Sequence, residues 1–183
     1  LPWKDLDIDV VVESTGFFTS TEKASAHITA GAKRVVITAP AKDAETPIVT
    51  PNVGMRFLEK SPISSNASCT TNATTPVVSV LMHNPGIVSG MLSTIHAYTS
   101  IQSTVDEVKK GSALHGRSAA MNIIPFVTGA AESVEKAIPE MHGKFDGMAF
   151  RVPVVTGSVI DFTFVAERET SIENVNEILR SAA

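Results

Sequence analysis

The segment Ser64-Ser65-Asn66-Ala67-Ser68-Cys69-Thr70-Thr71-Asn72 contains the only cysteine of this 183-residue chain. Small, hydroxylated and amide side chains flank the thiol, so no bulky neighbour in sequence blocks a reactant. The apolar-periodic stretch 76–83 follows closely and predicts a helix. A thiol near a helix N-terminus lies in the partial positive charge of that end, which favours the nucleophilic thiolate. We therefore predict that Cys69 is a reactive nucleophile, with a buried structural cysteine as the alternative.

The part of the chain before this segment has the pattern of a parallel βαβ unit. Residues 8–13 and 33–38 are rich in β-branched side chains and predict two buried strands. Between them, Thr19 and Glu22 have capping-box spacing and predict the start of a helix that Gly31 ends. A strand, a helix and a strand within about 30 residues predict two parallel strands joined by a crossover.

Four residues directly follow these two strands: Ser14, Thr15, Gly16 and Thr38. Ligands of open parallel sheets collect beyond the carboxyl ends of the strands. These four residues are therefore candidates for binding a cofactor, and plain turn residues are the alternative.

The rest of the chain predicts a mixture of loops, strands and helices. Loops are expected at 41–63, with a short strand near Ile48-Val49, and at 99–117. Strands are expected at 91–95, 147–153 and 157–167, a short apolar segment at 119–125, and helices at 129–138 and after Ser171. This order of elements indicates an α/β part followed by an α+β part.

Composition argues against several classes of partner. The formal net charge is −4, which disfavours nucleic acid and anionic membranes as partners. The apolar runs are shorter than the roughly 20 residues of a membrane span, and no secretory leader is visible. One cysteine forms no internal disulfide and fits a reducing, cytoplasmic location. We expect no bound metal, no nucleic acid and no membrane.

The segment 65–72 resembles the nucleophile segment of phosphorylating glyceraldehyde-3-phosphate dehydrogenase. Five further segments resemble the same family in the same order along the chain: Glu13-Ser14-Thr15-Gly16, His96-Ala97-Tyr98-Thr99, Asn122-Ile123-Ile124-Pro125, Thr128-Gly129-Ala130-Ala131 and Gly147-Met148-Ala149-Phe150-Arg151-Val152-Pro153. The resemblance implies the end of a Rossmann-type NAD(P)-binding domain (1–67) followed by a mixed-sheet catalytic domain (68–183) that is incomplete at its C-terminus. It also implies a homotetramer when the protein is complete.

The resemblance implies a reaction as well. Cys69 would attack the aldehyde carbon of glyceraldehyde 3-phosphate, and His96, which ends a predicted strand, would take the proton. A hydride would leave for NAD or NADP, and inorganic phosphate would open the thioester to give 1,3-bisphosphoglycerate, a step of glycolysis. A satisfied interior histidine is the alternative for His96, whereas His27 and His142 are expected on solvated surfaces.

The family likewise implies which residues bind phosphate. Thr99 and Arg151 would contact the substrate phosphate, and Arg117 would support the loop or the phosphate. The attacking phosphate would be held by Ser68, Thr70, Thr128 and Gly129. An arginine within the apolar run 148–155 requires a partner, so a structural ion pair with Asp161 is the alternative for Arg151.

The sequence also departs from the family. Ile101 stands where a hydroxyl or carboxylate is usual, Leu114 and His115 where arginine is common, and Ala73 where many members have a second cysteine. No Gly-x-Gly-x-x-Gly loop is present. Erythrose-4-phosphate dehydrogenase, a catalytically incomplete fragment, and a cysteine hydrolase using Cys69, His96 and an amide such as Asn72 or Asn122 therefore remain alternatives.

Overall fold

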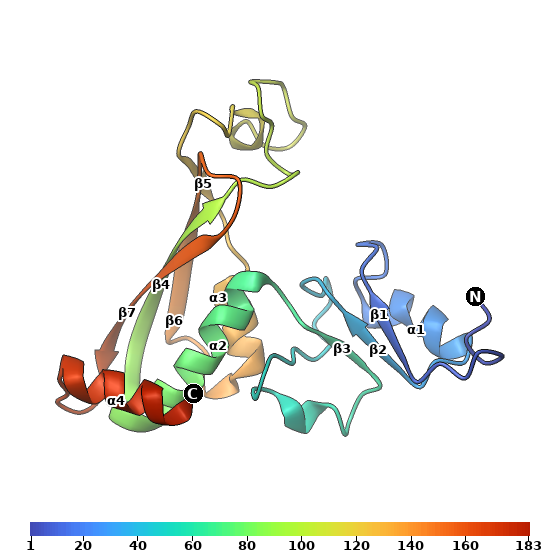
Figure 1. Cartoon of the computed structure of the whole chain (residues 1–183), viewed down its shortest axis with the longest axis horizontal. Helices are drawn as coiled ribbons and strands as arrows, with labels where there is room; N and C mark the ends of the chain where they lie inside the picture. Colours follow the sequence, from blue (N-terminus) through green and yellow to red (C-terminus); the bar gives the residue numbers. More distant parts are fainter.

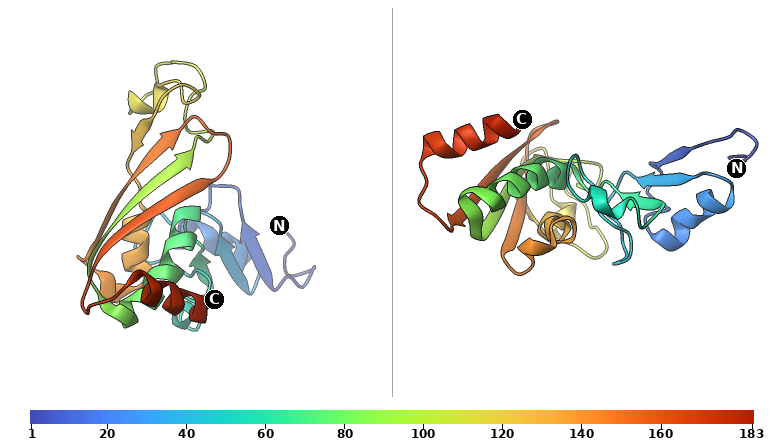
Figure 2. Two further views of the ribbon diagram at one scale, coloured as in Figure 1. Left: turned by 60° about the vertical axis from the view of Figure 1, so that its left-hand side comes forward. Right: turned by 90° about the horizontal axis from the view of Figure 1, so that it is seen from below.

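The computed structural model describes residues 1–183, which form two separate β-sheets and four α-helices (Figure 1). The first sheet is parallel, with the strand order β1-β2-β3, and lies at the N-terminal end of the molecule. The second sheet is mixed, with the order β5-β6-β4-β7, and is flanked by the helices α2, α3 and α4. The two parts lie side by side and give the molecule an elongated outline (Figure 2).

The predicted βαβ unit is confirmed. Strands β1 (Val10–Glu13) and β2 (Arg34–Ile37) pair in parallel, and helix α1 (Thr21–Thr29) connects them. The helix begins one residue later than capping by Thr19 would give, because the Ser20 hydroxyl accepts the hydrogen bond from the Lys23 amide. Gly31 follows the helix as predicted, with φ +110 and with the Lys4 backbone only 2.6 Å from where a Cβ would lie. Only glycine fits that position.

The third strand of this sheet was not predicted. Strand β3 (Ile63–Ser65) pairs in parallel with β2, although its sequence carries only one apolar side chain. The short strand predicted near Ile48-Val49 is an isolated bridge from Ile48 to Ser65, and a 3-10 turn spans Met55–Phe57. The segment entering Cys69 is thus already part of a sheet.

Helix α2 (Cys69–Leu81) begins seven residues earlier than the apolar period at 76–83 predicts. Ser68 caps it by accepting a hydrogen bond from the Thr71 amide. In the first turns Thr74 and Thr75 donate their hydroxyl protons to the carbonyls four residues earlier, so these polar side chains are satisfied inside the helix. Cys69 is consequently the first residue of the helix, and the helix ends in a turn over Met82–Gly86 at the predicted stop.

The mixed sheet confirms the predicted α+β part. Its long central strand β4 (Ile87–Ala97) pairs in parallel with β6 (Phe145–Val152) and antiparallel with β7 (Ser158–Ala166). The short strand β5 (Ile124–Phe126) pairs antiparallel with β6. Arg151 on β6 therefore lies beside His96 on β4 in the register, with Ile124 of β5 on the other side.

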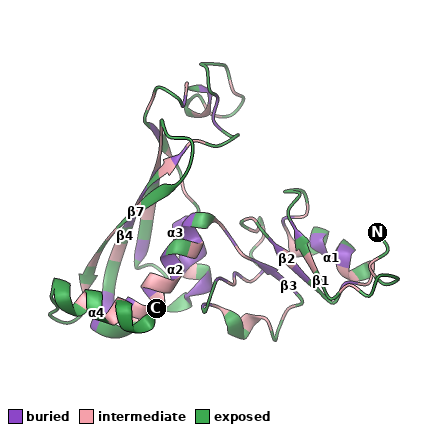
Figure 3. Ribbon diagram, in the orientation of Figure 1, coloured by how far each residue is buried: buried purple, intermediate pink, exposed green.

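The larger core lies between this sheet and its helices and continues into the segment before α2 through Ile48, Val53 and Ala67. It contains 14 buried residues, among them the nearly fully buried Val78 and Leu81 of α2, Val134 of α3 (Ala130–Ala137) and Leu92 of β4. Figure 3 shows the buried parts of α2 and α3. Helix α4 (Ile172–Ala182), capped by Ser171 as predicted, packs one apolar side against it. The loop after β4, with a 3-10 turn at Leu114–Gly116, extends beyond the end of the sheet (Figures 1 and 2). No helix combines the length and hydrophobicity that a membrane crossing requires.

Candidate active site

Cys69 and His96 meet where the N-terminus of α2 approaches the C-terminal end of β4. The Cys69 Sγ lies 3.3 Å from His96 Nε2, although the residues are 27 positions apart in sequence. The thiol is exposed, so it is accessible to a reactant. A helix N-terminus and a neighbouring imidazole are the surroundings in which proteins place reactive cysteines. This arrangement has the geometry of an activated thiol nucleophile.

The other ring nitrogen of His96 has two neighbours. His96 Nδ1 lies 2.8 Å from Arg151 Nη1 and 2.7 Å from the carbonyl oxygen of Ala97. Arg151 Nη1 also donates to that same carbonyl at 2.8 Å. Two tautomers fit these contacts. Nδ1 either accepts from Arg151, with the ring proton on Nε2, or donates to the Ala97 carbonyl, which leaves Nε2 free to accept from the thiol.

Arg151 is half-buried and has no carboxylate partner. Its guanidinium lies over the ring of Phe126, with 5.0 Å between Cζ and the ring centroid, and its Nε is buried without a hydrogen-bond partner. The alternative ion pair with Asp161 is therefore not formed. Burial lowers the pKa of the Arg151 guanidinium, and the electrostatic effect of the nearby Cys69 opposes that shift. A desolvated cation with unused donors suits an anionic ligand.

Two helix N-termini carry the remaining residues expected to hold an attacking phosphate. Ser68 and Thr70 lie at the start of α2, while Thr128 and Gly129 lie at the start of α3, which packs against α2. The Thr128 hydroxyl accepts from the Ala130 amide at 3.1 Å, and Gly129 is the exposed capping residue of α3. Helix N-termini bind anions through free backbone N–H groups.

The loop residues are placed differently. Thr99 is exposed just after β4, and its amide and hydroxyl donate to Gln102 Oε1 at 3.0 and 3.3 Å. Arg117 forms an exposed ion pair with Asp106 at 3.1 Å, within the extended loop. None of its hydrogen bonds or ion pairs reaches Cys69 or His96, so the loop-supporting role is the one that its contacts favour.

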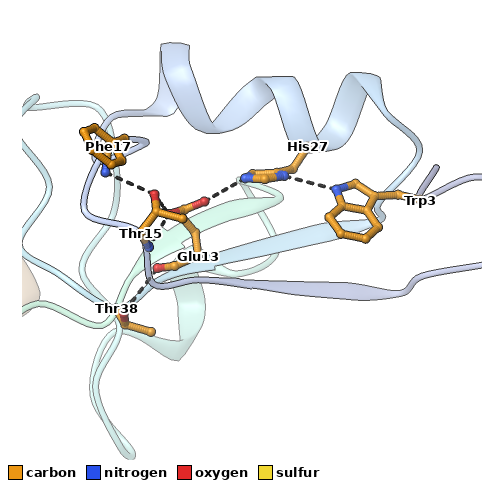
Figure 4. Close-up of polar contacts among 6 residues, drawn as sticks. All are labelled: Trp3, Glu13, Thr15, Phe17, His27 and Thr38. Carbon is orange, nitrogen blue, oxygen red and sulfur yellow. Dashed lines mark hydrogen bonds and ion pairs between the residues drawn. The ribbon is translucent and has the colours of Figure 1, made fainter. Parts of the chain in front are cut away.

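The four candidate cofactor residues form a second group, on the parallel sheet. Ser14, Thr15, Gly16 and Thr38 are all exposed beyond the C-terminal ends of β1 and β2. Glu13 connects the two strand ends: its carbonyl accepts from the Thr38 amide at 3.0 Å, and its carboxylate accepts from the Thr15 amide at 2.7 Å (Figure 4).

Sequence reasoning missed the side chains behind this group. The expectation that His27 is solvated was wrong, because His27 is buried against Glu13 and Trp3 (Figure 4). A glutamate that ends a strongly apolar strand was the available signal, since a carboxylate there must find hydrogen-bond donors.

The arrangement does not supply the third member of a cysteine-hydrolase triad. The Asn72 side-chain amide donates to the carbonyls of Asn66 and Ser68, and the Asn122 amide donates to the Ser118 carbonyl. Neither amide contacts His96. No group of three or more histidine, cysteine, aspartate or glutamate side chains converges as a metal site.

A thiol paired with an imidazole thus lies beside an arginine that lacks an acidic partner, in a mixed α+β domain. Residues 68–183 match the family described as "Glyceraldehyde 3-phosphate dehydrogenase, C-terminal domain". The whole chain is 48% identical to glyceraldehyde-3-phosphate dehydrogenase of Podospora anserina and 47% identical to that of Zymomonas mobilis, in each case over 54% of the relative's length. The corresponding protein of Atlantibacter hermannii is 45% identical over 62% of its length.

The chain belongs to the glyceraldehyde-3-phosphate dehydrogenase family. It spans about half the length of the first two curated relatives that it matches.

Proposed function

We propose that this chain carries the catalytic centre of an NAD(P)-dependent oxidoreductase of glycolysis. The reaction is the oxidation of glyceraldehyde 3-phosphate to 1,3-bisphosphoglycerate, with inorganic phosphate as second substrate. The observation that carries the proposal is the 3.3 Å contact between Cys69 Sγ and His96 Nε2 at the start of α2. Residues 1–67 are the end of the dinucleotide-binding domain in this proposal, residues 68–183 belong to the catalytic domain, and the complete protein is a cytoplasmic homotetramer.

Cys69 performs the covalent chemistry. Its sulfur attacks the aldehyde carbon, a C–S bond forms, and the carbonyl oxygen becomes the alkoxide of a thiohemiacetal. His96 Nε2, which faces the sulfur, takes the thiol proton, passes it to this oxygen, and takes it back from the thiohemiacetal hydroxyl as the hydride leaves. After the hydride has left carbon, a thioester remains on Cys69, and a phosphate oxygen then displaces the sulfur to give the acyl phosphate.

Arg151 and the two helix N-termini bind the two phosphate groups. The guanidinium of Arg151 is desolvated without an acidic partner, which supports a contact with the substrate phosphate, together with Thr99. Ser68, Thr70, Thr128 and Gly129 offer hydroxyl and backbone donors to the attacking phosphate. When Arg151 turns to a phosphate, His96 Nδ1 is left facing the Ala97 carbonyl, which accepts a hydrogen bond from the Nδ1–H of the imidazolium.

The nicotinamide cofactor, when bound, accepts the hydride that the thiohemiacetal releases. Exposed Ser14, Thr15, Gly16 and Thr38 beyond the parallel strands suit it, because a Cβ added at Gly16 would meet nothing within 4 Å, so the turn is open to a ligand. The cofactor of this proposal is NAD or NADP. The exposed Ile101 in place of a polar side chain keeps erythrose 4-phosphate as a second candidate substrate.

Acylation of Cys69 tests the proposal without cofactor. Incubation with 1,3-bisphosphoglycerate is expected to add the 3-phosphoglyceroyl group to Cys69, detected by intact mass, and inorganic phosphate is expected to remove it. Cys69→Ser is expected to abolish the adduct. A thioester that forms normally in His96→Asn, or that phosphate releases no faster than water does, would sink the assignment.

A further inference from the structure

A series of hydrogen-bonded polar side chains lies behind the turn at Ser14–Gly16, outside the proposed catalytic centre. Glu13 and His27 are 3% and 6% exposed, and His27 Nε2 lies 2.8 Å from Glu13 Oε2. Trp3 Nε1 donates to His27 Nδ1 at 3.1 Å (Figure 4). At the other end, the Thr15 amide and hydroxyl both donate to Glu13 Oε1.

The hydrogen bonds that link Trp3, His27 and Thr15 to Glu13 are all donated in the direction of the Glu13 carboxylate. An indole N–H only donates, so His27 Nδ1 accepts from Trp3, and the ring proton on Nε2 is donated to Glu13. Thr15 supplies two more donors from the opposite side. Burial alone would raise the pKa of the Glu13 carboxyl, but the hydrogen bonds from Thr15 and His27 together hold it below the ordinary value. The group that accepts all three bonds must therefore be an ionised carboxylate.

The two ends of this series of hydrogen bonds, Trp3 and Thr15, lie in different surroundings. Trp3 lies in the N-terminal segment and His27 on α1, whereas Thr15 is exposed in the turn. The apolar core of this region has only four buried residues, Ala24, Val35, Ile37 and Ile63, and none of them contributes to the turn itself. The Glu13 carbonyl also accepts from the amide and hydroxyl of Thr38. One residue thus connects both exposed strand ends to the interior.

We propose that Glu13, supported by His27 and Trp3, is a positioning residue that fixes the Ser14–Gly16 turn and Thr38 in the arrangement that receives the nicotinamide dinucleotide. The inference rests on the proposed cofactor contact of this turn. Glu13 itself faces inward and touches no ligand in this account. It acts by holding the Thr15 amide and hydroxyl in one orientation.

Substitution of Glu13 by glutamine separates this role from simple packing. The amide has nearly the same shape but only one acceptor oxygen, so it satisfies either Thr15 or His27 and turns its NH₂ group toward the other. In the 183-residue chain, NMR is expected to show about tenfold faster hydrogen exchange at the Thr15 amide when the NH₂ group faces Thr15, as for loss of one ordinary hydrogen bond. When the NH₂ group faces His27 instead, the fluorescence of Trp3 is expected to change. If the exchange rate and the fluorescence both stay as in the unchanged chain, the proposed role of Glu13 is overturned. Glu22→Gln, which changes an exposed glutamate of α1, is the matched control and is expected to leave that rate unchanged.

His27 offers a second pair of variants that does not depend on Glu13→Gln folding well. Glutamine at position 27 has both an acceptor for Trp3 and a donor for Glu13, whereas alanine has neither. His27→Gln is therefore expected to retain the slow exchange of the Thr15 amide, and His27→Ala is expected to lose it. The fluorescence of Trp3, the only tryptophan, reports whether its hydrogen bond to residue 27 is kept. Equal exchange rates of the Thr15 amide in the two variants would show that His27 does not support Glu13, and would overturn the proposal.

Titration with NAD completes the test. Millimolar NAD is expected to shift the Thr15 and Thr38 amide resonances of the unchanged chain and of Glu22→Gln, and to shift them at least about tenfold less effectively in Glu13→Gln. An equal response in Glu13→Gln overturns the positioning role alone. An absent response in the unchanged chain overturns the cofactor contact proposed above, while the exchange rates still report the hydrogen bonds.

Discussion

The two sheets of this chain present their candidate ligand-binding residues on very different supports. Around the mixed sheet, 14 buried residues hold α2 and β4 together, and Cys69 and His96 are carried on those two rigid elements. Around the parallel sheet, a core of four buried residues is supplemented by the hydrogen bonds of Glu13, His27 and Trp3. Apolar packing therefore positions Cys69 and His96, whereas the hydrogen bonds among Trp3, His27, Glu13 and Thr15 position the turn proposed to bind the cofactor.

The difference follows from what each site must do. A thiolate and an imidazole need a fixed separation, which packed helices and strands provide. A turn that offers backbone and hydroxyl groups to a ligand needs only a fixed orientation, which a few hydrogen bonds to a carboxylate provide. The predictions below test whether the two parts behave as separately as this comparison requires.

The largest expected effect comes from truncation of the two cores. Leu92→Ala should lower the free energy of unfolding of the mixed-sheet part by about 2–5 kcal/mol and slow Cys69 alkylation. Ile37→Ala should destabilise the parallel-sheet part by a similar amount and leave Cys69 alkylation unchanged. Hydrogen exchange resolved by region measures the stability of each part, and iodoacetamide measures the reactivity of Cys69. Loss of Cys69 reactivity in Ile37→Ala would show that the two parts are one cooperative unit.

Removal of the unpaired cation is expected to have the next largest effect. Arg151→Ala should reduce the efficiency of Cys69 acylation by 1,3-bisphosphoglycerate by about 10- to 100-fold, because a hydrogen bond to a charged group is lost. Acetyl phosphate, which has no second phosphate, should be affected far less. A parallel loss with both acyl donors, or unfolding of the variant, would favour a structural role for the arginine.

Acid should weaken the parallel-sheet part through Glu13. The pKa of this carboxyl is lowered from 4.5 on folding, so its contribution to stability is complete above pH 4.5 and is lost as pH falls through the folded-state value. The stability difference between the unchanged chain and Glu13→Gln should thus be largest near neutral pH and shrink below pH 4.5. Urea unfolding at a series of pH values measures it. A difference independent of pH would contradict the ionised carboxylate.

The smallest expected effect distinguishes two helix caps. Ser20→Ala removes the cap of α1, and Ser171→Ala removes that of α4, each at a cost of about 1 kcal/mol. Only the first should raise exchange at the Thr15 amide, because α1 carries His27. If both variants raise it equally, the effect on the turn comes from general destabilisation.

Particular residues show what the sequence could and could not predict. The βαβ unit, the Ser171 cap and the strands around Arg151 follow from local patterns. In each of them the apolar pattern or the cap residue lies within the same short segment of sequence as the element that it predicts. Strand β3 and the start of α2 were missed, because hydroxyl-rich segments have no apolar period and are satisfied by local hydrogen bonds. The contacts of Arg151 with His96, and of Glu13 with Trp3 through His27, join distant residues and depend on tertiary packing.

Local sequence already favoured Cys69 and His96, the resemblance paired them, and the structure brings them to 3.3 Å. Their roles, and those of the phosphate and cofactor contacts, remain predictions that chemistry must test. The local pattern alone left a buried cysteine and a satisfied interior histidine open, because neither residue lies in a periodic segment that fixes its orientation.

The rate of Cys69 alkylation at pH 7 tests the central claim, that these two residues act as a nucleophilic pair, most directly. Iodoacetamide should modify the unchanged chain and the control His83→Asn, which alters an exposed histidine, at the same high rate. In His96→Asn the rate should fall by at least about tenfold, because the imidazole beside the sulfur is lost. Equal rates in all three proteins would contradict the account.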